Sequence, residues 1–336
     1  MKYIDYNNCS FVIYGGNADY LKCLYSEEAE FNVILMQGLT PKMGSIYSFL
    51  YRMQNSEKIN RIVNIPLKFL WYKHLSQKKV LINNEKYFIF FDNNRLAQDD
   101  SFHAYLRRTF PEAKLIYMLS GVYNVSHLKS KNYIERLRDE FDLVITFDKE
   151  DANKYNWGYC PFPYTKVYVE HSYYPESDVF YVGYAKSESY PERFNCIIDT
   201  YSILQAAGLR CDFHIVGVDK KMQKYSNEIS YNKPITYQEV LQRVQKTKCI
   251  LEVIQPDQTG TTLRVQEAAL YKRKLLTNNQ YIKVEPWYNS KNIKVFNDPE
   301  DIDTNWILSP YEYSSINYED MFSYKRQLKF IVDYFK

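Results

Sequence analysis

The sequence predicts an α/β protein of two similar halves, each with its own parallel sheet, facing each other across a cleft. Three observations predict this class. Short apolar runs that end in Gly, Asp or a polar turn alternate with amphipathic, helix-like segments. Continuous apolar strands between such helices are typical of a parallel sheet covered on both faces. At 336 residues, the chain is also longer than one hydrophobic core usually serves.

The first half contains five candidate strands and three candidate helices. The strands are "SFVIYGG" (10–16), "FNVILMQG" (31–38), "KYFIFFD" (86–92), "AKLIYML" (113–119) and "DLVITFD" (142–148). The helices are 43–54, 95–109 and 132–141. Over 156–178 the periodicity fails, and three prolines predict a connector outside the core.

The alternation restarts after the connector. Strands are predicted for "DVFYVGYA" (178–185), "CDFHIVGV" (211–218), "CILEVIQ" (249–255), "RKLLTNN" (273–279) and "IKVFN" (293–297). Helices are predicted for 191–207 and 236–246, and one amphipathic helix for 318–335. We therefore expect a first domain over 1–168, a second over 169–316, and a C-terminal helix over 317–336 that can pack back on the first domain.

Composition excludes several classes of protein. With 46% hydrophobic and 25% charged residues the chain is globular, and a formal charge of +3 is too mild to indicate nucleic acid. No apolar run has the length of a membrane span or the form of a signal peptide. Six scattered cysteines without a C-x-x-C, and no H-E-x-x-H, argue against disulfides and against a metal site. We expect a cytoplasmic protein that at most rests against a membrane.

Ligands of open α/β sheets bind beyond the carboxyl ends of the strands, so candidate sites lie there. After the strand at 178–185 come Gly183, Lys186 and Arg193, the last just inside a helix that begins at Pro191. Glycine permits close backbone approach, and a helix start flanked by two cations is a ready phosphate site. A surface turn with two solvated cations is the alternative.

The stretch "DQTGTTLRVQEAALYKRKLLTNN" (257–279) follows the strand at 249–255. Gly260 allows a tight bend, and Thr261 and Thr262 can cap the next helix. Arg264 and Glu267 are three residues apart, hence on one helical face. They could neutralise a diphosphate and hold ribose hydroxyls, or form only a surface pair that contributes a few tenths of a kcal/mol.

A family resemblance connects these segments. The runs V-G-x-x-K…R (182–193), Y-x-E-V-L (237–241), Q-x-G-x-T-x-R-x-x-E-A (258–268) and K-L-L-T-N-N (274–279) resemble the donor-binding half of GT-B glycosyltransferases. The nearest resemblance is to bacterial enzymes that build capsule, O-antigen or lipopolysaccharide. It implies that Gly183, Lys186 and Arg193 face the donor diphosphate and that Glu267 holds the ribose. Gln258, Gly260, Thr261 and Thr262 would lie beside the sugar and the phosphates.

The chain departs from that family at one position. Many retaining members carry two glutamates eight positions apart, and the residue eight before Glu267 is Thr259. Retaining stereochemistry therefore does not follow from the resemblance. The adjacent Gln258 could keep a polar contact there.

The strand ends of the first half offer the acceptor-side candidates. Gly15 and Gly16 suit a loop that approaches a ligand closely, or a plain turn. A base must take the acceptor proton in an inverting transfer. Asp92 is the first candidate for this base, with His103 behind it, and Asp148 ends the last strand of this half. Each is also a common capping or packing residue.

We therefore expect a sugar transfer from a nucleotide-diphosphate sugar to a glycan or lipid-linked acceptor, with Arg264 and Asp92 as catalytic groups. The resemblance implies no bound metal and no cofactor besides the donor itself, because cationic side chains can stabilise the leaving diphosphate. Two alternatives stay open: a sugar-nucleotide epimerase of the same fold, and a non-catalytic protein that binds nucleotide or glycan.

Overall fold

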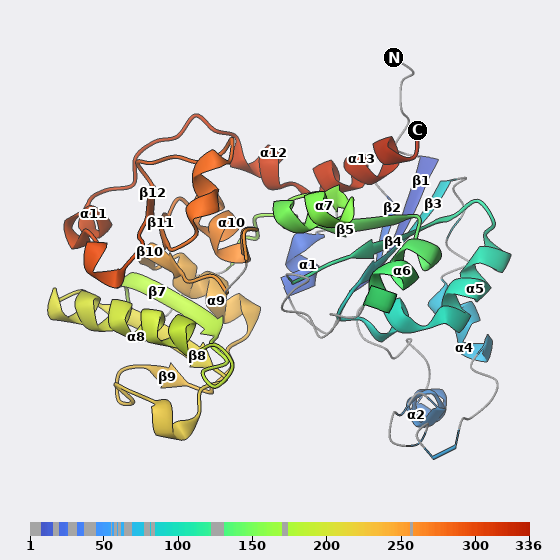
Figure 1. Cartoon of the computed structure of the whole chain (residues 1–336), viewed down its shortest axis with the longest axis horizontal. Helices are drawn as coiled ribbons and strands as arrows, with labels where there is room; N and C mark the ends of the chain where they lie inside the picture. Colours follow the sequence, from blue (N-terminus) through green and yellow to red (C-terminus); the bar gives the residue numbers. More distant parts are fainter. Residues whose placement is uncertain are drawn as a thin grey trace. The chain divides into compact units, whose positions relative to one another are not determined.

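The structure, a computed structural model, consists of two compact units (Figure 1). The first comprises 1–146 and 151–160, and the second comprises 147–150 and 161–336. The structure describes residues 8–15, 20–25, 32–36, 45–54, 56, 59, 62–63, 69–76, 81, 85–121, 131–169, 174–255 and 258–336. The four residues 147–150, of which the first two end the last strand predicted for the first half, thus group with the second unit.

A parallel sheet forms the centre of the first unit, with strand order β2-β1-β3-β4-β5-β6. All five strands predicted for this half are present. The sheet consists of β1 Cys9–Tyr14, β2 Asn32–Met36, β3 Glu85–Phe91, β4 Lys114–Met118, β5 Leu143–Thr146 and β6 Gly158–Tyr159. Strand order reverses between β1 and β3, so the carboxyl ends of these two strands form the switch point of this sheet.

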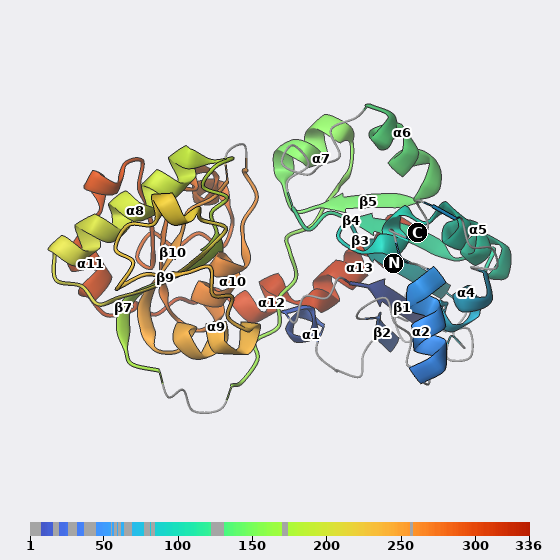
Figure 2. The same cartoon turned by 90° about the horizontal axis from the view of Figure 1, so that it is seen from below.

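Aromatic side chains fill one face of this sheet. Tyr14 stacks on Phe90 with ring centroids 4.6 Å apart and meets Phe102 edge-on at 5.6 Å. Phe102 belongs to α5, which lies beside α4 (Figure 2). The helices here are α1 Tyr20–Leu24, α2 Ser45–Gln54, α4 Phe69–Leu75, α5 Asp100–Thr109, α6 Lys131–Glu140 and α7 Lys149–Tyr155.

Two sequence predictions for this unit are wrong in detail. The helix expected over 95–109 is a 3₁₀ turn, η2 Arg95–Gln98, followed by α5, because the Asp99 side chain accepts a hydrogen bond from Phe102 N at 3.1 Å and starts a new helix. The 156–178 segment is not outside the core. It contributes β6, and its buried side chains include Trp157, Cys160, Phe162 and Tyr164.

The second unit has its own six-stranded parallel sheet, with order β12-β11-β10-β7-β8-β9. Its strands are β7 Ser177–Tyr184, β8 Cys211–Val216, β9 Ser230–Tyr231, β10 Thr247–Glu252, β11 Lys274–Thr277 and β12 Ile293–Val295. Only the two-residue β9 was not predicted. From β7 the chain moves outward through β8 to β9, and from β10 it moves in the opposite direction. This is the Rossmann order, and its switch point lies between β7 and β10.

Helices cover both faces of the second sheet. In Figure 2, α8 and α11 lie on one face and α9 and α10 on the other. The helices of this unit are α8 Pro191–Ala206, α9 Tyr237–Val244, α10 Leu263–Leu270, α11 Thr304–Leu308, α12 Tyr318–Phe322 and α13 Tyr324–Tyr334. The predicted α/β class with two Rossmann-like sheets is confirmed.

The C-terminal segment differs from the single helix predicted over 318–335. Ser323 has extended backbone angles and separates α12 from α13. Its hydroxyl accepts a hydrogen bond from Lys325 N at 3.2 Å and so caps α13. A serine at this position therefore ends one helix and begins the next.

Candidate functional site

The guanidinium of Arg193 bridges two strands at the switch point of the second sheet. Arg193, in the first turn of α8, donates from Nε to Val253 O at 2.8 Å and from Nη1 to Tyr184 O at 2.6 Å. These two carbonyls follow β10 and end β7, so one side chain ties the diverging strands together. Arg193 was predicted to face a diphosphate, and here its donors are largely used on the backbone.

The predicted phosphate turn after β7 is shaped mainly by tyrosines. A Cβ at Gly183 would lie 2.7 Å from the Tyr181 hydroxyl, so the glycine makes room for that ring. Lys186 has a positive φ of 48°. Its Nζ lies 6.0 Å from the ring centroid of Tyr184 and 5.9 Å from that of Tyr190. No carboxylate pairs with this ammonium in the described part of the chain, which leaves its charge available to an anion.

The loop 258–262, predicted to lie beside a donor, is anchored to Asp148. Thr259 N, Thr259 Oγ1 and Gly260 N donate to this carboxylate at 2.8, 2.7 and 2.7 Å. A Cβ at Gly260 would lie 2.7 Å from Phe147 O, so only glycine fits here. Gln258 closes the loop by donating from Nε2 to Gly260 O at 2.9 Å. Asp148, which we assigned to the first half, is thus the acceptor for the loop of the second unit.

A buried glutamate that sequence reasoning missed connects this loop to the sheet. Glu252 ends β10 and is 2% exposed. It accepts hydrogen bonds from Thr262 Oγ1 and Thr277 Oγ1, each at 2.6 Å. Burial raises the pKa of Glu252, and Arg264 lowers it. A lone Glu inside the apolar run "CILEVIQ" was the available signal, since a charge in a buried strand requires partners.

Arg264 and Glu267 form a buried pair instead of a surface pair. Arg264 Nη2 lies 2.6 Å from Glu267 Oε1, and Glu267 is 0% exposed. Tyr237 Oη also donates to Glu267 Oε1 at 2.9 Å, and a second hydrogen bond joins Tyr237 to Tyr164 at 2.8 Å. Glu267 Oε2 and Arg264 Nη1 are buried and have no hydrogen-bond partner among the described residues. Such unsatisfied polar atoms are rare in native proteins and mark a place where a bound group can complete the contacts.

The two predicted turns meet around Tyr181. Its pKa is raised by burial and lowered by the charges of both Arg193 and Arg264. Arg193 Nη2 lies 3.5 Å from the Tyr181 hydroxyl. The charges of Arg193 and Arg264, which are 71 positions apart in the sequence, therefore both act on one hydroxyl of the Rossmann-like sheet.

The pKa of Glu267 predicts how the stability of the protein depends on pH. Burial raises its pKa from the ordinary 4.5 to about 7, although Arg264 and Tyr237 act in the opposite direction. Above pH 4.5 the unfolded chain loses this proton while the folded chain keeps it until about pH 7, so its contribution to stability falls as pH rises through this window. The side chain in Glu267→Gln does not titrate. We therefore expect the free energy of unfolding of this variant, relative to that of wild type, to rise by about 2–3 kcal/mol from pH 5 to pH 8, as measured by urea unfolding.

Glu239→Gln is the matched control for this experiment. Hydrogen bonds from Thr236 lower the pKa of Glu239 below its ordinary 4.5, so its contribution to stability should stay constant between pH 5 and 8. An unfolding free energy of Glu267→Gln that runs parallel to that of wild type between pH 5 and 8 would contradict the raised pKa.

The acceptor-side candidates lie in the first unit, and most have structural partners there. Asp92 follows β3, and its carboxylate accepts a hydrogen bond from Ser120 Oγ. Burial raises the pKa of Asp92, as a base near neutral pH requires. A Cβ at Gly15 would meet the end of the Leu21 side chain in α1, so a larger residue here would require that side chain to shift. Gly16 lies outside the described residues.

His103 belongs to an ion-pair network. It is 4% exposed, its Nε2 lies 2.8 Å from Leu96 O, and its Nδ1 lies 3.1 Å from Glu140. Asp100, His103 and Glu140 come close enough to share a cation. Arg136 pairs with both carboxylates, at 2.7 Å to Glu140, and so supplies the positive charge itself. These contacts give His103 a structural role.

Comparisons with known proteins agree on the fold. No protein-family model and no curated protein matches the sequence. The chain is similar to a solved α-glucosyltransferase in complex with UDP-glucose and DNA containing an abasic site, with a TM-score of 0.52 and 12% identity over 96% of this chain and 98% of that one. It is also similar to the UDP-GlcNAc 2-epimerase of Methanocaldococcus jannaschii, with a TM-score of 0.45 and 13% identity over 96% and 99%. At 12% identity, the likeness to the α-glucosyltransferase supports the fold alone: two Rossmann-like domains, as in GT-B proteins.

Proposed function

We propose that the chain is a glycosyltransferase that moves a sugar from a nucleotide-diphosphate sugar to a glycan or lipid-linked acceptor in surface polysaccharide synthesis. The observation that carries the proposal is the buried Arg264–Glu267 pair at the carboxyl edge of the second sheet, with one unsatisfied atom on each side chain. A carboxylate oxygen accepts from ribose hydroxyls, and a guanidinium donates to phosphate. A nucleoside diphosphate would complete both.

Each group then has a step in the transfer. The acceptor hydroxyl oxygen bonds to the anomeric carbon of the sugar, and the bond from that carbon to the diphosphate oxygen breaks with its electron pair. Asp92 takes the hydroxyl proton. Arg264 and the free ammonium of Lys186 offset the charge that develops on the leaving diphosphate, without a metal ion.

Turnover by the purified chain tests this function. We expect nucleoside diphosphate release from one of a panel of UDP- and GDP-linked sugars. In Arg264→Met the release should fall at least about 100-fold, the effect of removing one charge-stabilising donor. Asp92→Asn should slow transfer, whereas the exposed Asp100→Asn should not. Conversion of the donor sugar to its epimer would instead identify an epimerase, and binding without turnover a non-catalytic protein.

We also propose that the protein works at a membrane surface on the cytoplasmic side. In the described part of the chain no helix is long and apolar enough to span a bilayer. Helices α2 and α4 nevertheless expose large apolar side chains: Ile46 (73%), Phe49 (61%), Phe69 (53%) and Leu70 (55%). Such a surface suits shallow insertion between lipid headgroups.

Vesicle sedimentation tests the membrane contact. The wild-type chain should pellet with anionic phosphatidylglycerol vesicles, and Ile46→Ser with Phe49→Ser should stay in the supernatant. The basic run at 106–110 is a weaker candidate, because Arg107 is held by Asp142 at 2.7 Å. Equal pelleting of wild type and the double variant would contradict a role for α2.

A further inference from the structure

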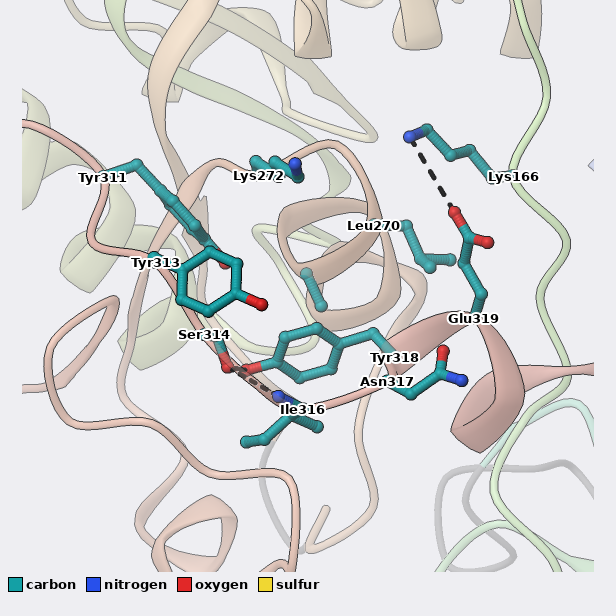
Figure 3. A pocket seen from close by; sticks show the side chains of 11 residues that line it. Lys166, Leu270, Lys272, Tyr311, Tyr313, Ser314, Ile316, Asn317, Tyr318 and Glu319 are labelled. Carbon is teal, nitrogen blue, oxygen red and sulfur yellow. Dashed lines mark hydrogen bonds and ion pairs between the residues drawn. The ribbon is translucent and has the colours of Figure 1, made fainter.

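A second cavity lies at the opposite end of α10 from the Arg264–Glu267 pair. Its volume is about 370 Å³, within the range of small-molecule sites. It is formed by the end of α10 at Leu270, by Lys272 just beyond the helix, and by the segment 311–319 that leads into α12 (Figure 3). Neither Arg264 nor Glu267 lines this cavity, although Glu267 precedes the lining residue Ala269 by only two positions in α10. The cavity is thus separate from the proposed donor site.

Tyrosine rings line one side of the cavity. Figure 3 shows the rings of Tyr313 and Tyr318 below Lys272 and Lys166. Tyr318 is buried and fixed, because its hydroxyl donates to Trp287 O at 3.4 Å and accepts from Ser314 Oγ at 3.4 Å. Tyr313 is 86% exposed, so its ring is open to a ligand.

Two lysines give the cavity a positive charge. Lys272 follows α10 with a positive φ of 54°, a conformation that turns the chain sharply at the rim. It has no carboxylate partner among the described residues. Lys166 lies 4.0 Å from Glu319, whose side chain is 70% exposed, so this pair is loosely held. Two ammonium groups and one carboxylate leave a net charge of one positive.

We propose that this cavity binds a sugar residue that carries one negative charge. The apolar C–H face of a pyranose ring packs on a tyrosine ring, while its hydroxyls reach polar groups such as Ser314 Oγ and the Asn317 amide at the rim. The lysines pair with a carboxylate or a phosphate on the same sugar. The site would hold an acidic glycan unit away from the donor, and it does not depend on the proposed transferase activity.

Binding of three small glycosides to the full chain tests this site. The probes are a methyl glucuronoside, methyl glucoside 6-phosphate and neutral methyl glucoside. Saturation-transfer NMR measures the binding of each probe. We expect the anionic sugars to bind at least about fivefold more tightly than the neutral one, because charge-assisted hydrogen bonds from lysine are stronger than neutral ones. The tighter of the two anionic sugars identifies carboxylate or phosphate as the preferred group.

Variants on exposed positions keep the test independent of folding. Lys272→Gln and Tyr313→Ala should each weaken binding about fivefold or more, whereas Lys220→Gln and Tyr334→Ala, both exposed and outside the cavity, should not. The double variant Arg264→Met with Glu267→Gln should bind the sugars like wild type even if it binds no nucleotide. Absence of binding, equal binding of charged and neutral sugars, or binding unaffected by Lys272→Gln would each overturn the proposal.

Discussion

Arg264→Ala is expected to lower the free energy of unfolding by about 3–5 kcal/mol. The variant would leave Glu267, which is 0% exposed, without its cation, and the Tyr237 hydroxyl would be its only remaining partner among the described residues. An uncompensated buried carboxylate is costly because the protein interior solvates charge poorly. Urea unfolding of wild type and variant measures the loss.

A double-mutant cycle separates the pair from the rest of the site. Arg264→Met with Glu267→Gln removes both charges at similar volume, so most of the lost stability should return, with a coupling energy of about 2–3 kcal/mol. Lys291→Ala is the control, because the Lys291–Glu312 pair is exposed and contributes about 0–1 kcal/mol. Additive losses in the cycle would mean that Arg264 and Glu267 do not stabilise each other.

Asp148→Ala should have a comparable effect through the loop 258–262. It would leave three donors at Thr259 and Gly260 without an acceptor in a buried setting. Each buried unsatisfied donor costs about 1–3 kcal/mol, so we expect a total loss of at least about 3 kcal/mol. Amide hydrogen exchange at Thr259 and Gly260 should also become much faster, because their N–H groups would no longer be bonded.

Asp303→Ala is the matched control for Asp148→Ala. The carboxylate of Asp303 also accepts from two backbone N–H groups, those of Asn305 and Trp306, but it is exposed and water can replace it. Its loss should cost about 1 kcal/mol. If Asp148→Ala costs no more than Asp303→Ala, and the loop amides exchange as in wild type, then Asp148 does not anchor the loop.

Most of the fold could be predicted from the sequence because parallel strands buried on both faces are continuous apolar runs. Ten strands were predicted and found, each followed by a polar or glycine turn. The misses have local causes. A two-residue strand such as Gly158–Tyr159 has no periodicity, and the prolines beside it indicated a connector. The break at Ser323 is invisible to amphipathic patterning, because both flanking helices share the same apolar period.

The candidate site was less predictable because its partners are distant in the sequence. Arg264 and Glu267 were found by helical spacing, but spacing alone did not distinguish a buried pair from an exposed one. Tyr237 and Asp148, which complete the contacts of Glu267 and of the Thr259 loop, lie 30 and 111 residues away. Many retaining members of the family that this chain resembles carry a glutamate at the position of Thr259. In this chain, Thr259 instead donates hydrogen bonds to the carboxylate of Asp148.

Calorimetric titration of the full chain with nucleoside diphosphates tests the central claim most directly. We expect saturable, one-to-one binding of UDP or GDP, because Glu267 Oε2 and Arg264 Nη1 are the buried atoms that such a ligand would satisfy. Binding should disappear in Arg264→Met with Glu267→Gln and persist in Lys291→Ala. No heat from any nucleoside diphosphate, or equal affinity in wild type and the double variant, would contradict the assignment of this pair as a nucleotide site.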